Sequence, residues 1–383
     1  MYPHDVPVLR QELLRTLSRR QIERNYLFVS HFAMVPCKLK RTDSDISLGA
    51  RSHPRHLRFL FDAITRARAH HLSCPDGIIS SWAAAAYAGL PFWADNAHTT
   101  LMVKNGKRNS TSPLLPHRRI VTSHILTYQP DPEFPSLQVM QPAVASAYCL
   151  RDIYRGHHAW WTNKVPGLTF REVRAIQFLD AMQFHTALNT DVVLENAHGI
   201  FNHRTLRRLI RLSDAGAESP PETILRLIAA PLRPGLTTQI PIFTTGCLRK
   251  LLTIVDAGWK DIRVGLFYDG EHHLHRNQRD YDSEVWATMR ELGWECLRVT
   301  QGMLGQPPLL NRSTARLENR VFAYLAVDLF NISALLARLS SANPTPPTTP
   351  NPTAPAPQSD VRRFRWHTRG RRLGLWWRRR VPR

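Results

Sequence analysis

The sequence predicts an α+β protein of several parts, and three observations lead to this expectation. Its 383 residues exceed one typical domain, and 43% hydrophobic with 21% charged residues is the balance of a globular chain. The spacing of apolar residues changes along the chain between the helical and the strand period, which indicates both kinds of element. We expect a mixed α/β region over 1–145, a helical connector over 146–215, an αβββαβ unit over 216–305, a C-terminal helix within 306–341 and a disordered end over 342–383.

The first two parts show short segments of both periods. The predicted elements are, in order, a charged helical start to about residue 25, an apolar stretch over 26–35, helices over 54–71 and 80–88, and strand-like pieces over 99–104 and 119–128. In the connector the helical period is clearest over 172–186 and 204–212. We find no internal repeat.

The third part has the clearest element boundaries. Its first helix begins at Ser219-Pro220-Pro221-Glu222, where a candidate N-cap precedes two prolines in the first turn. Strands are predicted over 238–244, 251–256 and 262–269, followed by a helix over 281–292 and a last strand over 294–300.

The chain is strongly basic, with 51 Lys and Arg against 30 Asp and Glu and a formal net charge of +21. Surplus positive charge attracts polyanions, so DNA is the expected partner, although a basic surface can also serve solubility alone. Residues 342–358 hold seven prolines and no charge, which predicts an extended linker. The tail beyond it interleaves arginine with tryptophan, which suits nucleic-acid phosphates and bases, an anionic membrane surface, or no dedicated role.

The cysteine content and the hydropathy of the chain indicate its cellular compartment. The five cysteines are far apart and odd in number, so neither a disulfide framework nor a zinc site is predicted. No apolar run reaches the roughly 20 residues of a membrane span, and the first residues lack the pattern of a secretory signal. We therefore expect a cytoplasmic protein without stable membrane insertion.

Acidic groups in the third part fall where strands are predicted to end. Asp256 closes the second predicted strand, and Asp269 closes the third, on the same face as Phe267 by the period of two. A polar run with Glu271, His272, His273 and His275 follows. Such groups can bind a hard divalent cation or transfer protons near neutral pH, and the alternative is a solvated polar loop.

The third part resembles a known family. The segments ESPPETILRL, VDAGWKDIRVGLFYDGEHH and RDYDSEVWATMRELGWECLRVT, over about residues 218–301, resemble the Vsr-like branch of the PD-(D/E)xK nuclease superfamily. Upstream, IISSWAAAAYAGLP and the body to about residue 215 resemble actinobacterial AbiEi-like antitoxin proteins. Proteins of that type commonly begin with a winged-helix DNA-binding unit, for which this sequence shows no clear pattern.

The resemblance implies a restriction-endonuclease-like core and a Mg²⁺ site. It implies that Asp256 is the main metal ligand, that Glu222 supports the metal site from the helix, and that His273 is an acid or base. Phe267 stands where many relatives have a carboxylate, and Asp269 stands where the superfamily has lysine. Asp269 is then either a replacement metal ligand or a turn cap.

Two functions follow from the resemblance. The first is a DNA-binding, Mg²⁺-dependent endonuclease that hydrolyses phosphodiester bonds. The second is a non-catalytic AbiEi-like antitoxin or transcriptional regulator with a degenerate nuclease fold, for which a cognate toxin protein is an expected partner.

Overall fold

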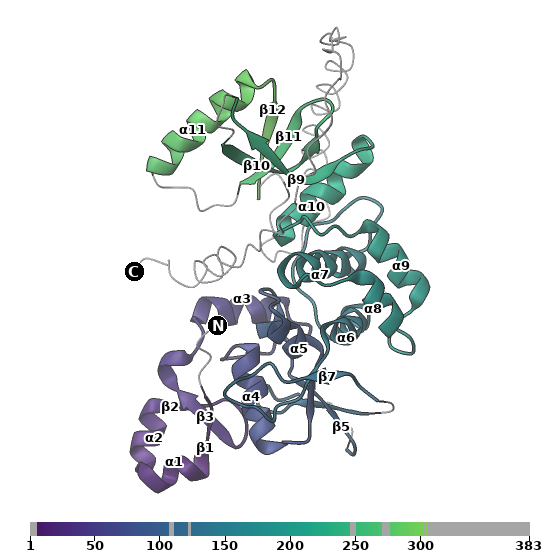
Figure 1. The fold of residues 1–383 in the computed structure, drawn as a ribbon. Helices are drawn as coiled ribbons and strands as arrows, with labels where there is room; N and C mark the ends of the chain where they lie inside the picture. The colour runs from purple at the N-terminus through teal and green to yellow at the C-terminus, as the bar shows by residue number, and fades with distance from the viewer. Residues whose placement is uncertain are drawn as a thin grey trace, which may run out of the picture. The chain divides into compact units, whose positions relative to one another are not determined.

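The structure, a computed structural model, is a mixed α+β protein, as the sequence predicts (Figure 1). The described residues are 6–106, 111–121, 124–245, 250–269, 276–301 and 304, and all belong to one compact unit of the chain. The helix expected within 306–341 and the linker and tail expected over 342–383 lie outside the described residues.

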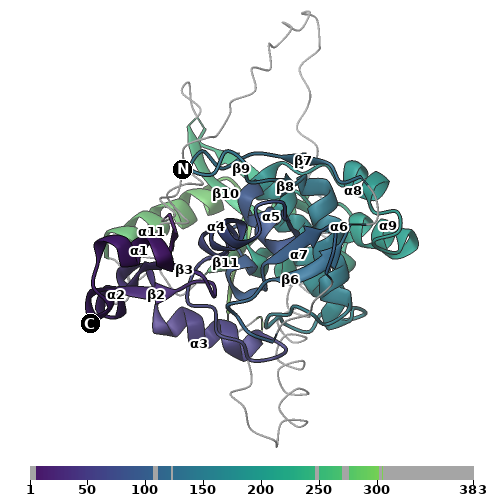
Figure 2. The same ribbon diagram turned by 90° about the horizontal axis from the view of Figure 1, so that it is seen from below.

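The N-terminal segment combines two short helices with a three-stranded sheet (Figure 2). Its elements are β1 (Val8–Leu9), α1 (Arg10–Thr16), α2 (Arg19–Asn25), β2 (Tyr26–Phe28) and β3 (Ala33–Pro36). The sheet is antiparallel in the order β1-β3-β2, and Leu13, Ile22 and Met34 form a small core between the helices and the strands. The expected helical start is thus two helices, and the expected apolar stretch is a β-hairpin.

A five-stranded sheet follows in the order β6-β5-β4-β8-β7. Its strands are β4 (Ile78–Ser80), β5 (Thr100–Val103), β6 (His117–Ile120), β7 (Thr127–Tyr128) and β8 (Val139–Met140), and its helices are α3 (Asp43–Ser52), α4 (Ala63–Ser73) and α5 (Ser81–Ala88). The helix predicted over 54–71 begins only at Ala63. The reason is the Asp62 carboxylate, which accepts the backbone N–H groups of Ile64 and Thr65 and so caps the first turn.

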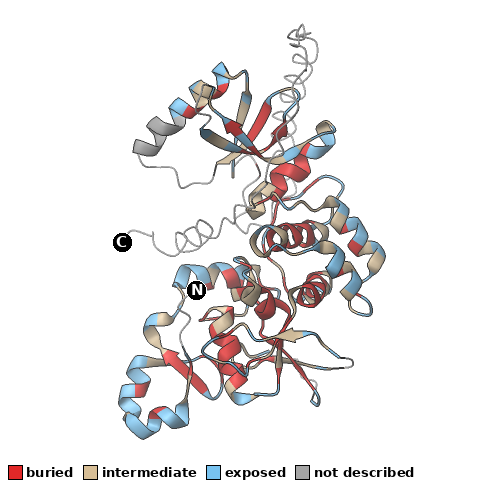
Figure 3. Cartoon of the chain, in the orientation of Figure 1, coloured by how far each residue is buried: buried red, intermediate tan, exposed pale blue. Residues whose placement is uncertain are grey.

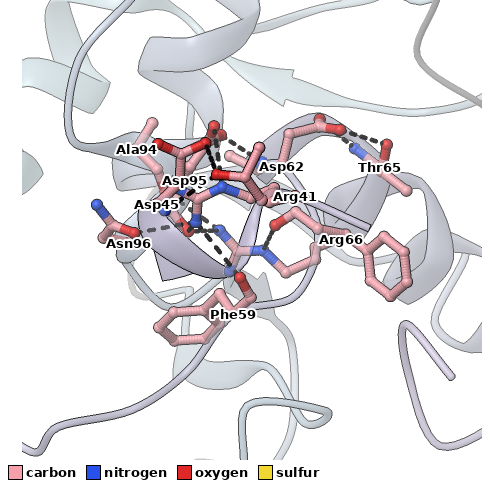
Figure 4. Close-up of polar contacts among 12 residues, drawn as sticks. Arg41, Asp45, Phe59, Asp62, Thr65, Arg66, Ala94, Asp95 and Asn96 are labelled. Carbon is pink, nitrogen blue, oxygen red and sulfur yellow. Dashed lines mark hydrogen bonds and ion pairs between the residues drawn. The ribbon is translucent and has the colours of Figure 1, made fainter. Parts of the chain in front are cut away.

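A buried arginine network joins α4 to the short η2 turn (Ala94–Asn96), as Figure 4 shows. Arg66 is 2% exposed and donates to the carbonyl oxygens of Phe61 at 3.1 Å and Ala97 at 2.6 Å. Arg41 donates to the Asn96 side chain at 3.0 Å. Because buried carbonyl groups need donors, these two arginines hold the chain before β5 in place.

The connector is helical, as predicted. It contains α6 (Pro142–Tyr154), α7 (Phe170–Thr186), α8 (Thr190–Asn196) and α9 (His203–Leu212). Helix α7 begins with a reciprocal capping box between Thr169 and Glu172, and it is buried along most of its length (Figure 3). Within the described residues, no helix is long and apolar enough to cross a bilayer.

The last part has the predicted αβββαβ order. Its elements are α10 (Pro220–Ala229), the short η3 (Ala230–Leu232), β9 (Thr237–Phe243), β10 (Leu251–Trp259), β11 (Val264–Asp269), α11 (Arg276–Glu291) and β12 (Glu295–Thr300). The sheet order is β12-β11-β10-β9, with β11 and β12 parallel and the other neighbours antiparallel. A core of Ile240, Ile242, Val255, Val285 and Met289 packs between this sheet and α11.

Candidate functional site

Glu222 lies in the first turn of α10 and is held by polar groups around the helix start. The Ser219 hydroxyl donates to its Oε1 at 2.7 Å, and the Glu218 backbone N–H donates to its Oε2 at 3.0 Å. The Gln239 side chain of β9 donates to the same Oε2 at 3.4 Å. Ser219 is the N-cap, as predicted, but its side chain bonds the Glu222 carboxylate instead of a backbone N–H. The helix start therefore orients Glu222 toward the sheet.

Helix α10 is fixed to α7 through the fully buried Asp180. The Asp180 carboxylate accepts Thr223 Oγ1 at 2.9 Å, Arg226 Nη2 at 2.8 Å and the Asp214 backbone N–H at 2.7 Å. Burial nevertheless raises the pKa of Asp180 to about 6, which Arg226 opposes. These three hydrogen bonds prevent α10 from sliding along α7. They therefore also fix the position of Glu222 at the start of α10.

Asp256 lies where two strands separate. The pairing of β10 with β11 runs from Trp259 opposite Val264 to Ala257 opposite Leu266 and ends there. Asp256 is the next residue, and its Oδ2 accepts the backbone N–H of Tyr268 at 2.6 Å in place of a ladder bond. The prediction that Asp256 ends its strand is wrong, because β10 continues to Trp259 through pairing with both β9 and β11.

Glu222 and Asp256 are electrostatically coupled. Burial, followed by the negative charge of Asp256, raises the pKa of Glu222 well above its ordinary value. Burial also raises the pKa of Asp256; the bond from Tyr268 opposes this shift, and the charge of Glu218 adds to it. Burial raises the pKa of Glu218 as well. Three carboxylates therefore share a desolvated region, an arrangement that costs free energy unless protons or a cation neutralise it.

Asp269 lies on the α11 side of the sheet. Its carboxylate forms an ion pair with Arg298 Nη2 at 2.6 Å, and that guanidinium lies over the Trp286 ring of α11. Phe267, two residues earlier, packs on the same ring with centroids 5.2 Å apart. Leu266 alternates with these residues and is fully buried on the other face, which α10 covers.

The four predicted site residues therefore divide. Glu222 and Asp256 come together, Asp269 is placed with Arg298, and His273 lies outside the described residues. Among the residues that the structure describes, no three His, Cys, Asp or Glu side chains form a group that could hold a metal ion. Glu218 was not predicted, although its spacing of four from Glu222 across a helix start is visible in the sequence.

A second candidate surface lies on α2, which the sequence analysis did not identify. Ser18 and Gln21 form a capping box, in which the Ser18 backbone N–H donates to Gln21 Oε1 at 2.9 Å. Ile22 is buried, while Arg19, Arg20 and Arg24 are exposed. The hairpin of β2 and β3 follows directly, and Phe32 at its tip is 61% exposed. The S-R-R-Q pattern of the capping box is the signal that could have located this helix start.

The comparisons with known proteins give no relative for this chain. No family model, no curated protein and no solved structure matches it.

Proposed function

We propose that this protein binds duplex DNA and that its αβββαβ unit is a restriction-endonuclease-like, Vsr-like nuclease that hydrolyses phosphodiester bonds with Mg²⁺. The observation that supports this proposal best is that Glu222 accepts from Gln239 of β9 at 3.4 Å, at the position between the pairs Val255–Ile240 and Ala257–Thr238 and so opposite Asp256. Structural carboxylates are usually paired with cations, whereas these two face one another in a desolvated region. Strongly shifted pKa values of this kind are typical of functional sites.

The donor chemistry of the pair fits Mg²⁺. This cation prefers hard oxygen ligands and is commonly held by one or two carboxylates, the remaining positions being water and substrate phosphate. Asp256 would hold the ion directly, and Glu222 would support it through water. Bound there, Mg²⁺ would polarise the scissile phosphate and lower the pKa of the attacking water.

The chain's own residues prepare this site. The Tyr268 N–H fixes the rotamer of the Asp256 carboxylate, and Ser219 fixes that of Glu222. Mg²⁺ beside Asp256 would favour the ionised form of Glu222. His273 remains the proposed acid or base.

DNA binding is assigned to the N-terminal segment. A short helix, a tight turn, a second helix and a β-hairpin form the order of a winged helix-turn-helix, in which the second helix enters the major groove. Helix α2 would place Arg19, Arg20 and Arg24 against the DNA, and the hairpin tip with Phe32 would act as the wing. The net charge of +21 supports a polyanionic partner.

A non-catalytic role is the second candidate. Phe267 packs against Trp286 and Asp269 pairs with Arg298, so the strand that supplies further catalytic groups in the superfamily is used here for packing and an ion pair. An AbiEi-like antitoxin or transcriptional regulator, with a cognate toxin as partner, would bind DNA through α2 but would not hydrolyse phosphodiester bonds.

Nicking of supercoiled plasmid DNA by the full chain separates the two candidates. A nuclease would convert the plasmid with Mg²⁺ and not with EDTA, and Asp256→Ala would abolish the reaction while DNA binding persists. Asp191→Ala, at an exposed acid on α8, is the matched control and should leave nicking unchanged. DNA binding without nicking at any Mg²⁺ concentration would favour the regulator.

A further inference from the structure

Helix α9 presents four arginines on one face. Arg204, Arg207, Arg208 and Arg211 recur at spacings of three and four residues, and all four are exposed. Such positions lie on the same side of a helix. On the other side Leu206 is fully buried and Leu209 is 1% exposed. We call the four residues the α9 arginine stripe.

The α9 arginine stripe stands on a rigid support. Asn202 caps the helix by accepting the Thr205 backbone N–H at 2.9 Å, and the buried leucines pack the helix against α7 and α8. Arg208 forms an ion pair with Glu172, whose other oxygen accepts the Thr169 backbone N–H at 2.8 Å in the α7 capping box. The stripe is therefore fixed at its centre to the first turn of α7.

Folding does not account for the other three arginines. Within the described part of the chain, Arg204, Arg207 and Arg211 form no ion pair with a carboxylate. Like charges three or four residues apart repel each other along a helix and lower its stability. An anionic partner would remove this repulsion, which the solubility of a basic surface alone does not require to be concentrated on one helix face.

The geometry favours a phosphodiester backbone as that partner. From Arg204 to Arg211 the helix rises about 10.5 Å, at 1.5 Å per residue, so the stripe can meet consecutive phosphates of one strand. Guanidinium groups bind phosphate oxygens through paired N–H donors. An anionic membrane surface fits less well, since a helix lying in a bilayer inserts its apolar face, and here that face is already packed within the protein.

We propose that the α9 arginine stripe is a second DNA-contacting element, which binds the sugar–phosphate backbone without reading sequence. This inference rests on the DNA binding in the proposed function and adds a surface that is distinct from α2. It assigns base contacts to α2 and backbone contacts to α9.

The experiment compares three triple variants of the full chain by salt-dependent binding to duplex DNA. The stripe variant is Arg204→Gln, Arg207→Gln and Arg211→Gln, and the α2 variant is Arg19→Gln, Arg20→Gln and Arg24→Gln. A control with equal charge loss is Arg51→Gln, Arg55→Gln and Arg58→Gln, at exposed positions on α3 and the following loop. Circular dichroism establishes that each variant is folded, and polyglutamate serves as a competing anionic polymer.

The stripe variant should reduce the slope of log K against log salt by about 2–3, at roughly 0.9 per lost phosphate contact, and by the same amount for unrelated DNA sequences. The control should change the slope much less. Equal slopes for the stripe variant and the control would overturn the inference, and so would a loss of polyglutamate binding with DNA binding unchanged. If the α2 variant binds DNA as tightly as the unmodified protein while the stripe variant binds more weakly, the proposed winged helix is wrong and the α9 arginine stripe is supported. Absence of DNA binding by the unmodified chain would overturn both.

Discussion

The Asp256 carboxylate accepts the backbone N–H of Tyr268 at 2.6 Å, at the point where the pairing of β10 with β11 ends. This bond replaces the ladder bond that the separating strands can no longer make, so the side chain both stabilises the fork and faces Glu222. A single carboxylate thus links the local backbone geometry to the electrostatics of the proposed site.

Asp256→Asn should abolish plasmid nicking and raise the thermal stability of the metal-free protein at neutral pH. The amide oxygen can still accept the Tyr268 N–H, while the buried charge beside Glu222 is gone. Because the folded-state pKa of Asp256 is raised above its unfolded value, the carboxylate stabilises the fold only when protonated and loses that contribution as pH rises. Melting at pH 5 and pH 8 checks this, and the gain should be about 1–3 kcal/mol at pH 8 and smaller at pH 5.

Asp191→Asn, at an exposed position, is the control and should leave the melting temperature within the error of the measurement. A melting temperature of Asp256→Asn below that of the unmodified protein at pH 8 would mean that Asp256 is a structural anion and would contradict the site.

Phe267→Glu should destabilise the protein without strengthening Mg²⁺ binding. Phe267 packs on Trp286, beside the core that includes Val285 and Met289, and so lies on the α11 side of the sheet. A carboxylate there would lose the ring packing on Trp286 and stand beside Arg298, its cross-strand partner, which Asp269 already engages, at a cost of about 1–3 kcal/mol. Denaturant unfolding and Mg²⁺ titration calorimetry of this variant check the two parts, and tighter Mg²⁺ binding would place position 267 in the metal site after all.

The sequence predicted the C-terminal element order well, because each element there has a regular apolar period and clear stops. Ser219 with two prolines, and Gly293 after α11, mark helix ends that the structure keeps. The position of Asp256 within its strand was not predictable, since it depends on pairing with β9 and β11. Register between strands comes from tertiary packing, which the period of two does not encode.

The N-terminal segment was harder to predict because its elements are short. Helices α1 and α2 have seven residues each and bury only one apolar side chain apiece, Leu13 and Ile22. Two turns of helix give little periodicity to detect. The role of Asp180 was also hidden, since its partners Asp214, Thr223 and Arg226 meet it only after the chain folds back.

Asp180→Ala should lower the free energy of unfolding by about 3–5 kcal/mol. The change leaves the buried Arg226 guanidinium without its carboxylate. The free energy of burying that charge is then no longer compensated by an opposite charge. Thr223→Val, which removes one donor to the same carboxylate, should cost only about 1–2 kcal/mol. Urea unfolding measures both, and equal small effects would show that α10 is held mainly by apolar packing.

A group of mostly buried histidine rings brings together the end of α3, the chain before β5, the start of β6 and the connector. The His53 ring is 6.1 Å from that of His98 and 6.3 Å from that of His158, and His98 stacks on His117 at 3.9 Å. Neither ring nitrogen of His98 has a hydrogen-bond partner among the described residues. Burial lowers the pKa of His53 to about 4, that of His158 to about 3 and that of His98 to about 2.

These histidines should therefore lower the stability of the fold as pH falls below about 6.5, against the opposite contribution of the raised-pKa carboxylates Glu222 and Asp256. In the unfolded chain each ring binds a proton near pH 6.5, whereas the folded protein keeps it neutral until much lower pH, so acid favours the unfolded state. Each histidine should contribute about 1.4 kcal/mol per pH unit between pH 6.5 and its folded-state pKa. His158→Leu should reduce the slope of the unfolding free energy against pH by the amount that one histidine contributes, about 1.4 kcal/mol per pH unit. His198→Gln, at an exposed ring, should leave that slope unchanged. Urea unfolding between pH 5 and pH 7 measures the slope, and a slope that His158→Leu leaves unchanged would mean that this ring already carries a proton in the folded protein.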